Sequence, residues 1–227
     1  MRPLSSILIA SAILSGCVAT RSTPIDEPST LEGLQRVQVD GIDAVYRRPN
    51  ADFSQYRRLL IRDADIAFSR GWERDQNSAT NSWTQEDSER IRKDLRDLFA
   101  EVAKQELQTR GGYELVSQPG PDVLEIRPSI VDLYIAAPDT SRSEPGIVRR
   151  YTTDAGRMTL IAELRDSLSG EVLARAFDKH EAMHTEQWEW TTSVTNSQKA
   201  RIAISSWAST LREALDGARA TSRTAQR

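Results

Sequence analysis

Two histidines and a glutamate lie close enough in the sequence to form a metal-binding motif. Residues His180-Glu181-Ala182-Met183-His184 fit the pattern H-E-x-x-H. On a helix, this spacing brings both imidazoles to one face, where they can bind Zn²⁺ while the glutamate activates a metal-bound water as general base. The pattern therefore predicts, as one alternative, a zinc-dependent hydrolase of the metallopeptidase kind.

The surroundings of this motif favour a strand instead of a helix. Asp178 and Glu186 put charges beside the motif, and Glu213, on the last predicted helix, is the one candidate that we name for a third ligand. On a strand, residues 180 and 184 lie on the same face but about 13 Å apart, at about 3.3 Å per residue, too far for one zinc ion. We therefore interpret both histidines as solvent-facing strand residues and predict no metal or other cofactor.

Aromatic residues give a second lead. Trp188 and Trp190 alternate with polar residues in a spacing that places both rings on one face of a strand. Packing against the last helix is one interpretation of this pair. The functional alternative is a contact patch for a partner protein, a glycan or a lipid.

Two polar segments are long enough to be binding loops. Trp72 and Trp83 lie near the ends of the first, at 69–83, and the second covers 138–148. Loops of this length in a small domain are often functional. We therefore predict that these loops and tryptophans provide a surface for a binding partner.

Two segments have the apolar period of amphipathic helices. The first is predicted over 85–109, with Thr84 as its N-cap and glycines at 111 and 112 as its end. The second is predicted over 197–217 and ends at Gly217. Each helix carries an apolar stripe, which requires a partner surface to cover it.

Alternating apolar residues predict the strands that cover these helices. In one long candidate, 122–137, the apolar positions change parity, and Pro128 at the change predicts a bulge. Turn residues at 166–171 predict a hairpin between a strand at 158–165 and one that starts at Val172. The sequence therefore predicts an α+β fold, a two-layer sandwich with a mostly antiparallel sheet and two helices packed on one face.

The N-terminus has the layout of a secretory signal. Arg2 precedes an apolar run that is shorter than the about 20 residues needed to span a bilayer. The run ends in the sequence LSGC at residues 14–17, which resembles the lipobox of bacterial lipoproteins. This resemblance implies removal of residues 1–16 and acylation of Cys17, the one cysteine in the chain. By the same resemblance, Val18 favours the outer membrane over retention at the inner membrane.

Composition sets the remaining limits. The chain has 227 residues and a formal net charge of −3, which gives no support for nucleic-acid binding. Residues 17–31 are polar, contain two prolines and are expected to form a flexible tether. Residues 32–217 are expected to form one periplasmic domain, and 218–227 a disordered tail.

Part of this pattern resembles a known family. Residues 56–61, 123–131 and 162–172, together with a final helix that carries Trp207, are similar to bacterial lipoproteins known only by a domain-of-unknown-function label. The most specific part is the hairpin at 163–171, with its acidic residues, serine and glycine. The resemblance implies an envelope lipoprotein and supplies no catalytic residues.

Together these observations predict a lipid-anchored envelope protein on the periplasmic face of the outer membrane. We expect a binding or scaffolding module without enzymatic activity, held at the membrane through Cys17 and working with an envelope protein partner. The alternative is a zinc-dependent hydrolase that uses His180, Glu181 and His184. A third interpretation is a carrier for a small apolar ligand between the helices and the sheet, which requires a preformed apolar cavity.

Overall fold

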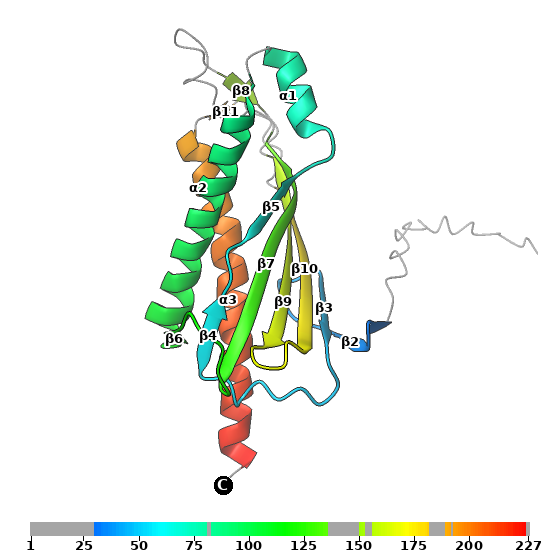
Figure 1. The fold of residues 1–227 in the computed structure, drawn as a ribbon, viewed down its shortest axis with the longest axis vertical. Coiled ribbons are helices and arrows are strands. Elements are labelled where there is room, and N and C mark those ends of the chain that lie inside the picture. The colour runs from blue at the N-terminus through cyan, green and yellow to red at the C-terminus, as the bar shows by residue number, and fades with distance from the viewer. Residues whose placement is uncertain are drawn as a thin grey trace, which may run out of the picture.

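The structure, a computed structural model, has an α+β fold in which a mixed sheet lies beside helices that pack together (Figure 1). It describes residues 30–80, 83–135, 150–152, 156–181, 189–191 and 193–225. Several predicted features lie outside the described residues: the signal peptide at 1–16, Cys17 and the tether as far as residue 29, the loop at 138–148, His184 and Trp188.

Nine strands form the main sheet, in the order β1-β2-β3-β10-β9-β7-β4-β6, with β5 also paired to β7. These strands are β1 (Thr30–Leu31), β2 (Leu34–Val37), β3 (Ala44–Arg47), β4 (Arg58–Ile61), β5 (Asp65–Phe68), β6 (Glu114–Leu115), β7 (Val123–Tyr134), β9 (Arg157–Asp166) and β10 (Val172–Glu181). Two further strands, β8 (Arg150–Thr152) and β11 (Glu189–Thr191), form a separate antiparallel pair.

The sheet is mixed because one side of it contains parallel pairs. Strands β4 and β5 both run parallel to β7, and β4 also runs parallel to β6. Parallel neighbours need a crossover connection, and the chain supplies one with the helices between β5 and β6. The prediction of a mostly antiparallel sheet missed these pairs, whereas the predicted β9–β10 hairpin is confirmed.

The helices are α1 (Trp72–Thr80), α2 (Gln85–Ala103) and α3 (Ser193–Ala225), and α2 continues as a π-helix, η1 (Lys104–Arg110). The predicted N-cap of α2 is confirmed, because Thr84 and Asp87 form a capping box. The prediction of a polar loop at 69–83 is wrong in part, because nine of these residues form α1.

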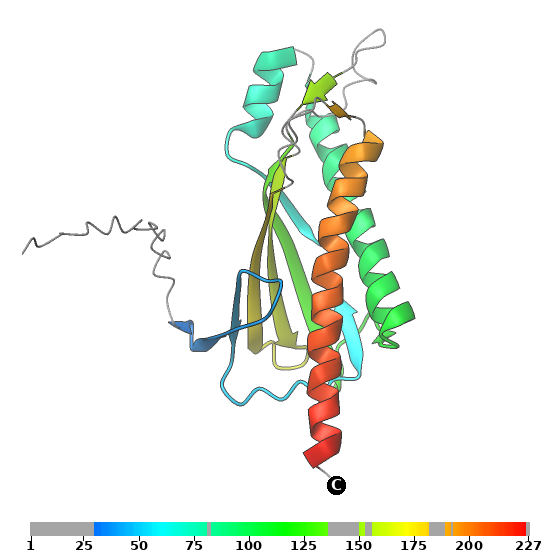
Figure 2. The same ribbon diagram turned by 180° about the vertical axis from the view of Figure 1, so that it is seen from behind.

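The predicted end of the last helix at Gly217 is also wrong. Helix α3 runs through this glycine to Ala225, so most of the tail predicted to be disordered at 218–227 is helical (Figure 2). A glycine inside a helix costs only about 1 kcal/mol. Beyond it, the Arg219 guanidinium lies 3.7 Å from the centre of the Tyr113 ring, a contact that holds this part of α3 against the domain.

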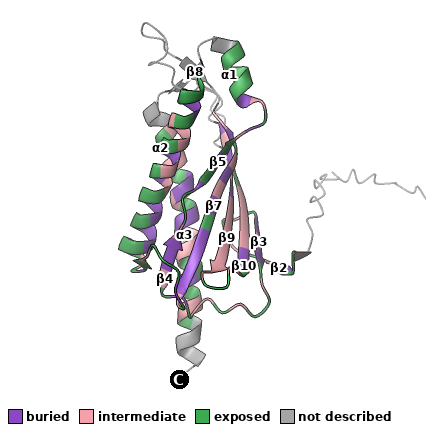
Figure 3. Ribbon diagram, viewed as in Figure 1, coloured by how far each residue is buried: buried purple, intermediate pink, exposed green. Residues whose placement is uncertain are grey.

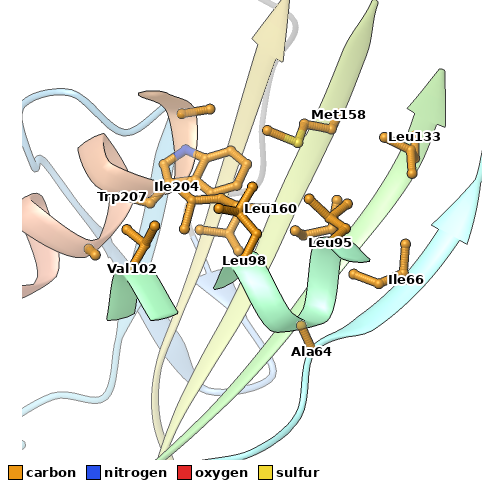
Figure 4. Close-up of a cluster of buried hydrophobic side chains, with 13 residues drawn as sticks. Ala64, Ile66, Leu95, Leu98, Val102, Leu133, Met158, Leu160, Ile204 and Trp207 are labelled. Carbon is orange, nitrogen blue, oxygen red and sulfur yellow. The ribbon is translucent and has the colours of Figure 1, made fainter. Parts of the chain in front are cut away.

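The core lies between the sheet and the two long helices. Buried side chains of α2 and α3 form one cluster with residues of β5, β7 and β9, as Figure 4 shows for Leu98, Trp207 and Leu160. A second cluster surrounds Leu107 and Leu124. In Figure 3, the buried positions alternate with exposed ones along α2, as expected for an amphipathic helix.

The long strand β7 changes parity later than predicted. The alternation of faces continues through Pro128, because Leu124 and Ile126 before it and Ile130 after it are all buried in the two core clusters. The irregularity in pairing with β9 instead occurs between Val131 and Tyr134, around Asp132, whose φ is 55°. The left-handed backbone conformation of Asp132, rather than the proline, therefore changes which residues of this strand face the core.

Candidate functional site

A row of small side chains crosses four strands on the side of the sheet that faces the helices. Pro128 of β7 pairs with Ala162 of β9, and Ala162 pairs with Ala176 of β10. Ala176 in turn pairs with Val45 of β3. Residues directly opposite one another in a sheet share a face. This row therefore leaves space where large apolar side chains would normally fill the layer between the sheet and the helices.

An apolar pocket of about 120 Å³ occupies that space, and all four residues of the row line it. The helices also contribute small side chains, those of Ala103, Ala208 and Ala214. Among the described residues that line the pocket, Thr210 alone carries a hydroxyl group. A cavity of about 150 Å³ lined by apolar side chains stays dry and binds benzene. The pocket can therefore hold an apolar group of roughly that size.

The pocket lies where the two core clusters meet. Leu160 and Trp207 belong to the first cluster, Leu107 and Ile126 to the second, and all four line the pocket. The walls therefore consist of side chains that are already packed on their other sides. Such walls form a preformed site rather than a gap that opens only when a ligand arrives.

One carboxylate connects the pocket wall to the segment between β2 and β3. Asp178 accepts a hydrogen bond from the Trp207 indole Nε1 at 2.5 Å and another from the backbone N–H of Asp43 at 3.0 Å. Asp43 accepts one from the backbone N–H of Lys179 at 2.9 Å. The segment that ends at Asp43 also contributes two apolar side chains to the pocket lining, Val39 and Ile42. Asp178 therefore fixes this edge of the pocket.

The opposite face of the same strands carries charged side chains, and we call it the charged face. Glu125 of β7 is only 2% exposed, and its Oε1 accepts hydrogen bonds from Arg62 Nε at 2.5 Å and from Arg127 Nε at 3.0 Å. Burial favours the neutral carboxyl group, but the bonds from the two arginines outweigh it and lower the pKa of Glu125. Glu125 is thus held as a carboxylate inside the protein.

Glu163 repeats this arrangement on the neighbouring strand β9. It accepts hydrogen bonds from Arg165 and from Arg175 of β10, each with its shortest distance at 2.5 Å. Arg175 also bonds Glu32, in the turn between β1 and β2. Burial opposes ionisation of Glu163, yet the two arginines lower its pKa. The charged face thus links strands through ion pairs with alternating signs.

The turn of the β9–β10 hairpin is held by its own side chains. Asp166 accepts the backbone N–H groups of Leu168 and Ser169 and the hydroxyl of Tyr56. The hydrogen bond from the Ser169 backbone is the largest cause of the lowered pKa of Asp166. Burial, followed by the bond to Asp166, raises the pKa of Tyr56 to about 12. The residues that make this hairpin distinctive therefore fix the turn and its attachment to the domain.

The family follows from a comparison with known proteins. Residues 27–211 match the family described as a protein of unknown function, DUF3313. The chain belongs to the DUF3313 family. This result confirms the domain-of-unknown-function part of the predicted resemblance, while the lipoprotein part stays a prediction. Among curated proteins there is no match to the sequence of this DUF3313 chain.

Solved structures give distant similarities to the DUF3313 domain. PelC from Paraburkholderia phytofirmans, solved as a dodecamer, is 11% identical with a TM-score of 0.39, over 74% of this chain and 96% of that one. Protein XCC0632 from Xanthomonas campestris, of family DUF330, is 13% identical with a TM-score of 0.32, over 77% and 93%. A putative neuraminyllactose-binding hemagglutinin homolog from Helicobacter pylori is 10% identical with a TM-score of 0.32, over 70% and 88%.

Membrane spans and metal sites can be assessed for the described part of this DUF3313 chain. None of the helices there combines the length and apolar character that crossing a bilayer requires. Within the same residues, no three side chains of His, Cys, Asp or Glu converge in a way that could hold a metal ion.

The predicted zinc motif of the DUF3313 chain begins on a strand. The strand predicted from Val172 is confirmed as far as Glu181, with His180 paired to Met158 and Glu181 to Arg157. Successive residues of a strand point to opposite faces, so His180 and Glu181 diverge. The second histidine lies outside the described residues. Glu213, named as the third ligand, lies on α3 and bonds Ser209 and Arg212.

Two of the four predicted contact tryptophans are buried in the DUF3313 domain. Trp72 is 1% exposed and Trp83 is 8% exposed. Trp72 stacks on Phe68 with 4.4 Å between ring centres, and Trp83 meets Trp72 edge-on at 5.2 Å. They fix α1 to the sheet and are not available as exposed contact surface. Trp190 lies in β11, opposite Tyr151 of β8.

The residues that line the pocket of this DUF3313 chain were not predicted from the sequence as a set. An apolar cavity between the helices and the sheet was, however, one of the predicted alternatives. Alanines and a proline carry no chemical signature. The available signal was the small side chain at alternate strand positions, Ala162 in one strand and Ala174 and Ala176 in the next. Only the register between the strands, which the structure supplies, aligns them.

Proposed function

We propose that this chain is a lipid-anchored binding protein of the bacterial envelope that holds a small apolar ligand in the pocket between α3 and the sheet. Cys17 would carry the anchor, and the predicted tether would end at residue 29, because Thr30 and Leu31 form β1. The domain would work on the periplasmic face of the outer membrane without catalysing a reaction. The observation that carries this proposal is the preformed pocket, which is lined almost entirely by apolar side chains.

The energetic cost of an empty pocket supports a binding role. At about 24 cal/mol per Å³, an empty cavity of this size costs about 3 kcal/mol of stability. That is a large share of the about 5–15 kcal/mol by which a domain is stable. Exchange of one lining alanine for a larger apolar residue would remove much of the cost, yet six of the lining residues are alanines: Ala103, Ala162, Ala174, Ala176, Ala208 and Ala214.

An envelope protein partner forms the second part of the proposal. An apolar ligand dissolves poorly in water, so exchange with another apolar environment would be favoured over release into water. A membrane or a second protein can provide that environment, and an acyl anchor would keep the domain near both.

A binding experiment with benzene tests the pocket directly. The full chain carrying Cys17→Ser, which removes the predicted acylation site, is titrated with benzene while methyl resonances of the lining residues are followed by NMR. We expect saturable shifts that are lost in Ala176→Leu, which fills the pocket, and kept in Ala100→Leu, which places the same side chain at an exposed position of α2. Absence of saturable binding in the parent chain would contradict the proposal.

Fractionation of cells tests the anchor. The chain with Cys17 intact is expected in the outer-membrane fraction, and Cys17→Ala is expected to be lost from that fraction. A Cys17→Ala protein that stays with the outer membrane would show that another feature holds it there.

A further inference from the structure

One arginine continues a row of pocket-lining residues. Across the sheet, Ile126 pairs with Leu164, Leu164 with Ala174, and Ala174 with Arg47 of β3. The first three of these line the pocket. Arg47 lies two residues after Val45, which also lines the pocket, so the alternation of a strand places Arg47 on the same side of the sheet. A cationic side chain thus stands at the β3 edge of an apolar site.

This arginine differs from its neighbours in having its charge available. Arg48 is bonded to the backbone carbonyl of Val172 and paired with Glu171, and Arg175 is paired with Glu163. Arg47 is exposed, and its guanidinium makes no hydrogen bond or ion pair with any described residue. Nothing in the described domain therefore competes for this charge.

The two ends of the pocket differ in charge. Asp178 lies on the same face of β10 as Ala174, four residues away, which is about 13 Å along the strand. Both oxygens of its carboxylate already accept hydrogen bonds, from Trp207 and from the backbone of Asp43. A ligand with a negative group would therefore be repelled from the Asp178 end and attracted to the Arg47 end.

We infer that the pocket binds the apolar end of an anionic amphiphile, such as the hydrocarbon part of a carboxylic acid, whose headgroup pairs with Arg47. This inference rests on the proposed function, because it specifies the ligand of the same pocket. The pocket volume limits the enclosed part to a group about the size of benzene, so a longer chain would extend out past β3.

Three probes with the same six-carbon chain test this inference: hexanoate, hexanol and hexylammonium. Each is titrated into the full chain carrying Cys17→Ser, and into the same chain with Arg47→Gln, Arg47→Glu or Arg70→Gln. Arg70→Gln removes one exposed positive charge near α1 and so serves as the matched control. Dissociation constants come from the NMR shifts of the lining methyl groups.

We expect Arg47→Gln to weaken hexanoate binding by about three- to fivefold, the range for an ion pair at an exposed position. Hexanol binding should change less than twofold. Arg47→Glu should weaken hexanoate further and strengthen hexylammonium, and Arg70→Gln should leave all three probes unchanged. Equal effects of Arg47→Gln and Arg70→Gln on hexanoate, or no effect of either, would overturn the role of Arg47.

The same experiment separates the two levels of the proposal. Loss of hexanol and benzene binding together would remove the pocket as a binding site and with it the proposed function. Retained binding of these neutral probes, with hexanoate insensitive to Arg47, would overturn only the assignment of an anionic ligand.

Discussion

The two faces of the central sheet are built from the same strands but differ in chemistry. Toward the helices, β3, β10, β9 and β7 present small apolar side chains that leave a pocket. On the charged face, β7, β9 and β10 present glutamates and arginines in ion pairs. Ion pairs depend on direction and partner, whereas apolar contacts do not. The comparison indicates that ion pairs on the charged face favour one alignment of the strands, whereas the apolar face leaves a pocket unfilled.

Loss of a buried carboxylate should be the largest effect. Glu125→Ala removes the group that both Arg62 and Arg127 contact, and we expect the free energy of unfolding to fall by about 2–3 kcal/mol. The loss stays below the most extreme values for buried ion pairs because both arginines are partly exposed and can be hydrated. Urea denaturation measures the change.

Glu114→Ala, at an exposed position of β6, is the control for this substitution and should change stability by less than about 0.5 kcal/mol. Equal effects at the two positions would mean that the charged face does not stabilise the sheet.

An alanine-to-leucine exchange on each face of the sheet tests whether the two faces differ in how tightly they are packed. Ala176→Leu places a larger side chain in the pocket and should raise the free energy of unfolding by about 1 kcal/mol. Ala44→Leu adds the same atoms on the other side of the sheet, where Ala44 is buried beside Leu34 and Tyr46, and should lower it by about 1–2 kcal/mol. Thermal and urea unfolding of both variants test this. If both substitutions destabilise alike, the pocket is not a space that a side chain can fill.

A fall in pH should reduce the contribution of the charged face to the free energy of unfolding. Of the three predicted effects on stability, this one should be the smallest. The pKa values of Glu125 and Glu163 are lowered in the folded protein from the ordinary value of 4.5. Their contribution to stability is therefore complete above about pH 4.5 and is lost as the pH falls through the lower folded values. Glu163→Gln should reduce this loss by up to about 1 kcal/mol.

Urea midpoints of the parent chain and Glu163→Gln, measured at pH 7, 5, 4 and 3, test this expectation. Parallel curves for the two proteins would contradict it, because they would mean that protonation of Glu163 has no influence on folding.

The elements with strong local signals were predicted well. The helix that starts after Thr84 has its capping box, and the β9–β10 hairpin forms around Asp166 as its turn chemistry indicated. Errors arose where distant contacts overrule local pattern. Trp72 stacks on Phe68 and meets Trp83 edge-on, and these contacts anchor α1, so part of a segment predicted as a polar loop is a helix. Likewise, contact with Tyr113 helps to hold α3 beyond Gly217.

The candidate site could be predicted only as a location. An apolar cavity between helices and sheet was one of the expected alternatives, but its lining depends on the pairing of Val45, Pro128, Ala162 and Ala176. Strand β3, strand β7 and the β9–β10 hairpin are distant from one another in the sequence, so no local pattern fixes the register between them. The parallel pairing of β4 with β7 was missed for the same reason.

The β9–β10 hairpin has a consequence for how relatives of this protein can diverge. The described hydrogen bonds of its turn join Asp166 and Ser167 to other turn residues, to Tyr56, to Gly120 and to Val123, and none of these involves a residue that lines the pocket. An exchange of Ala162 or Ala176 would therefore leave these turn contacts intact. The side chains that line the pocket can therefore vary while the turn of the hairpin and its attachment to Tyr56 stay the same.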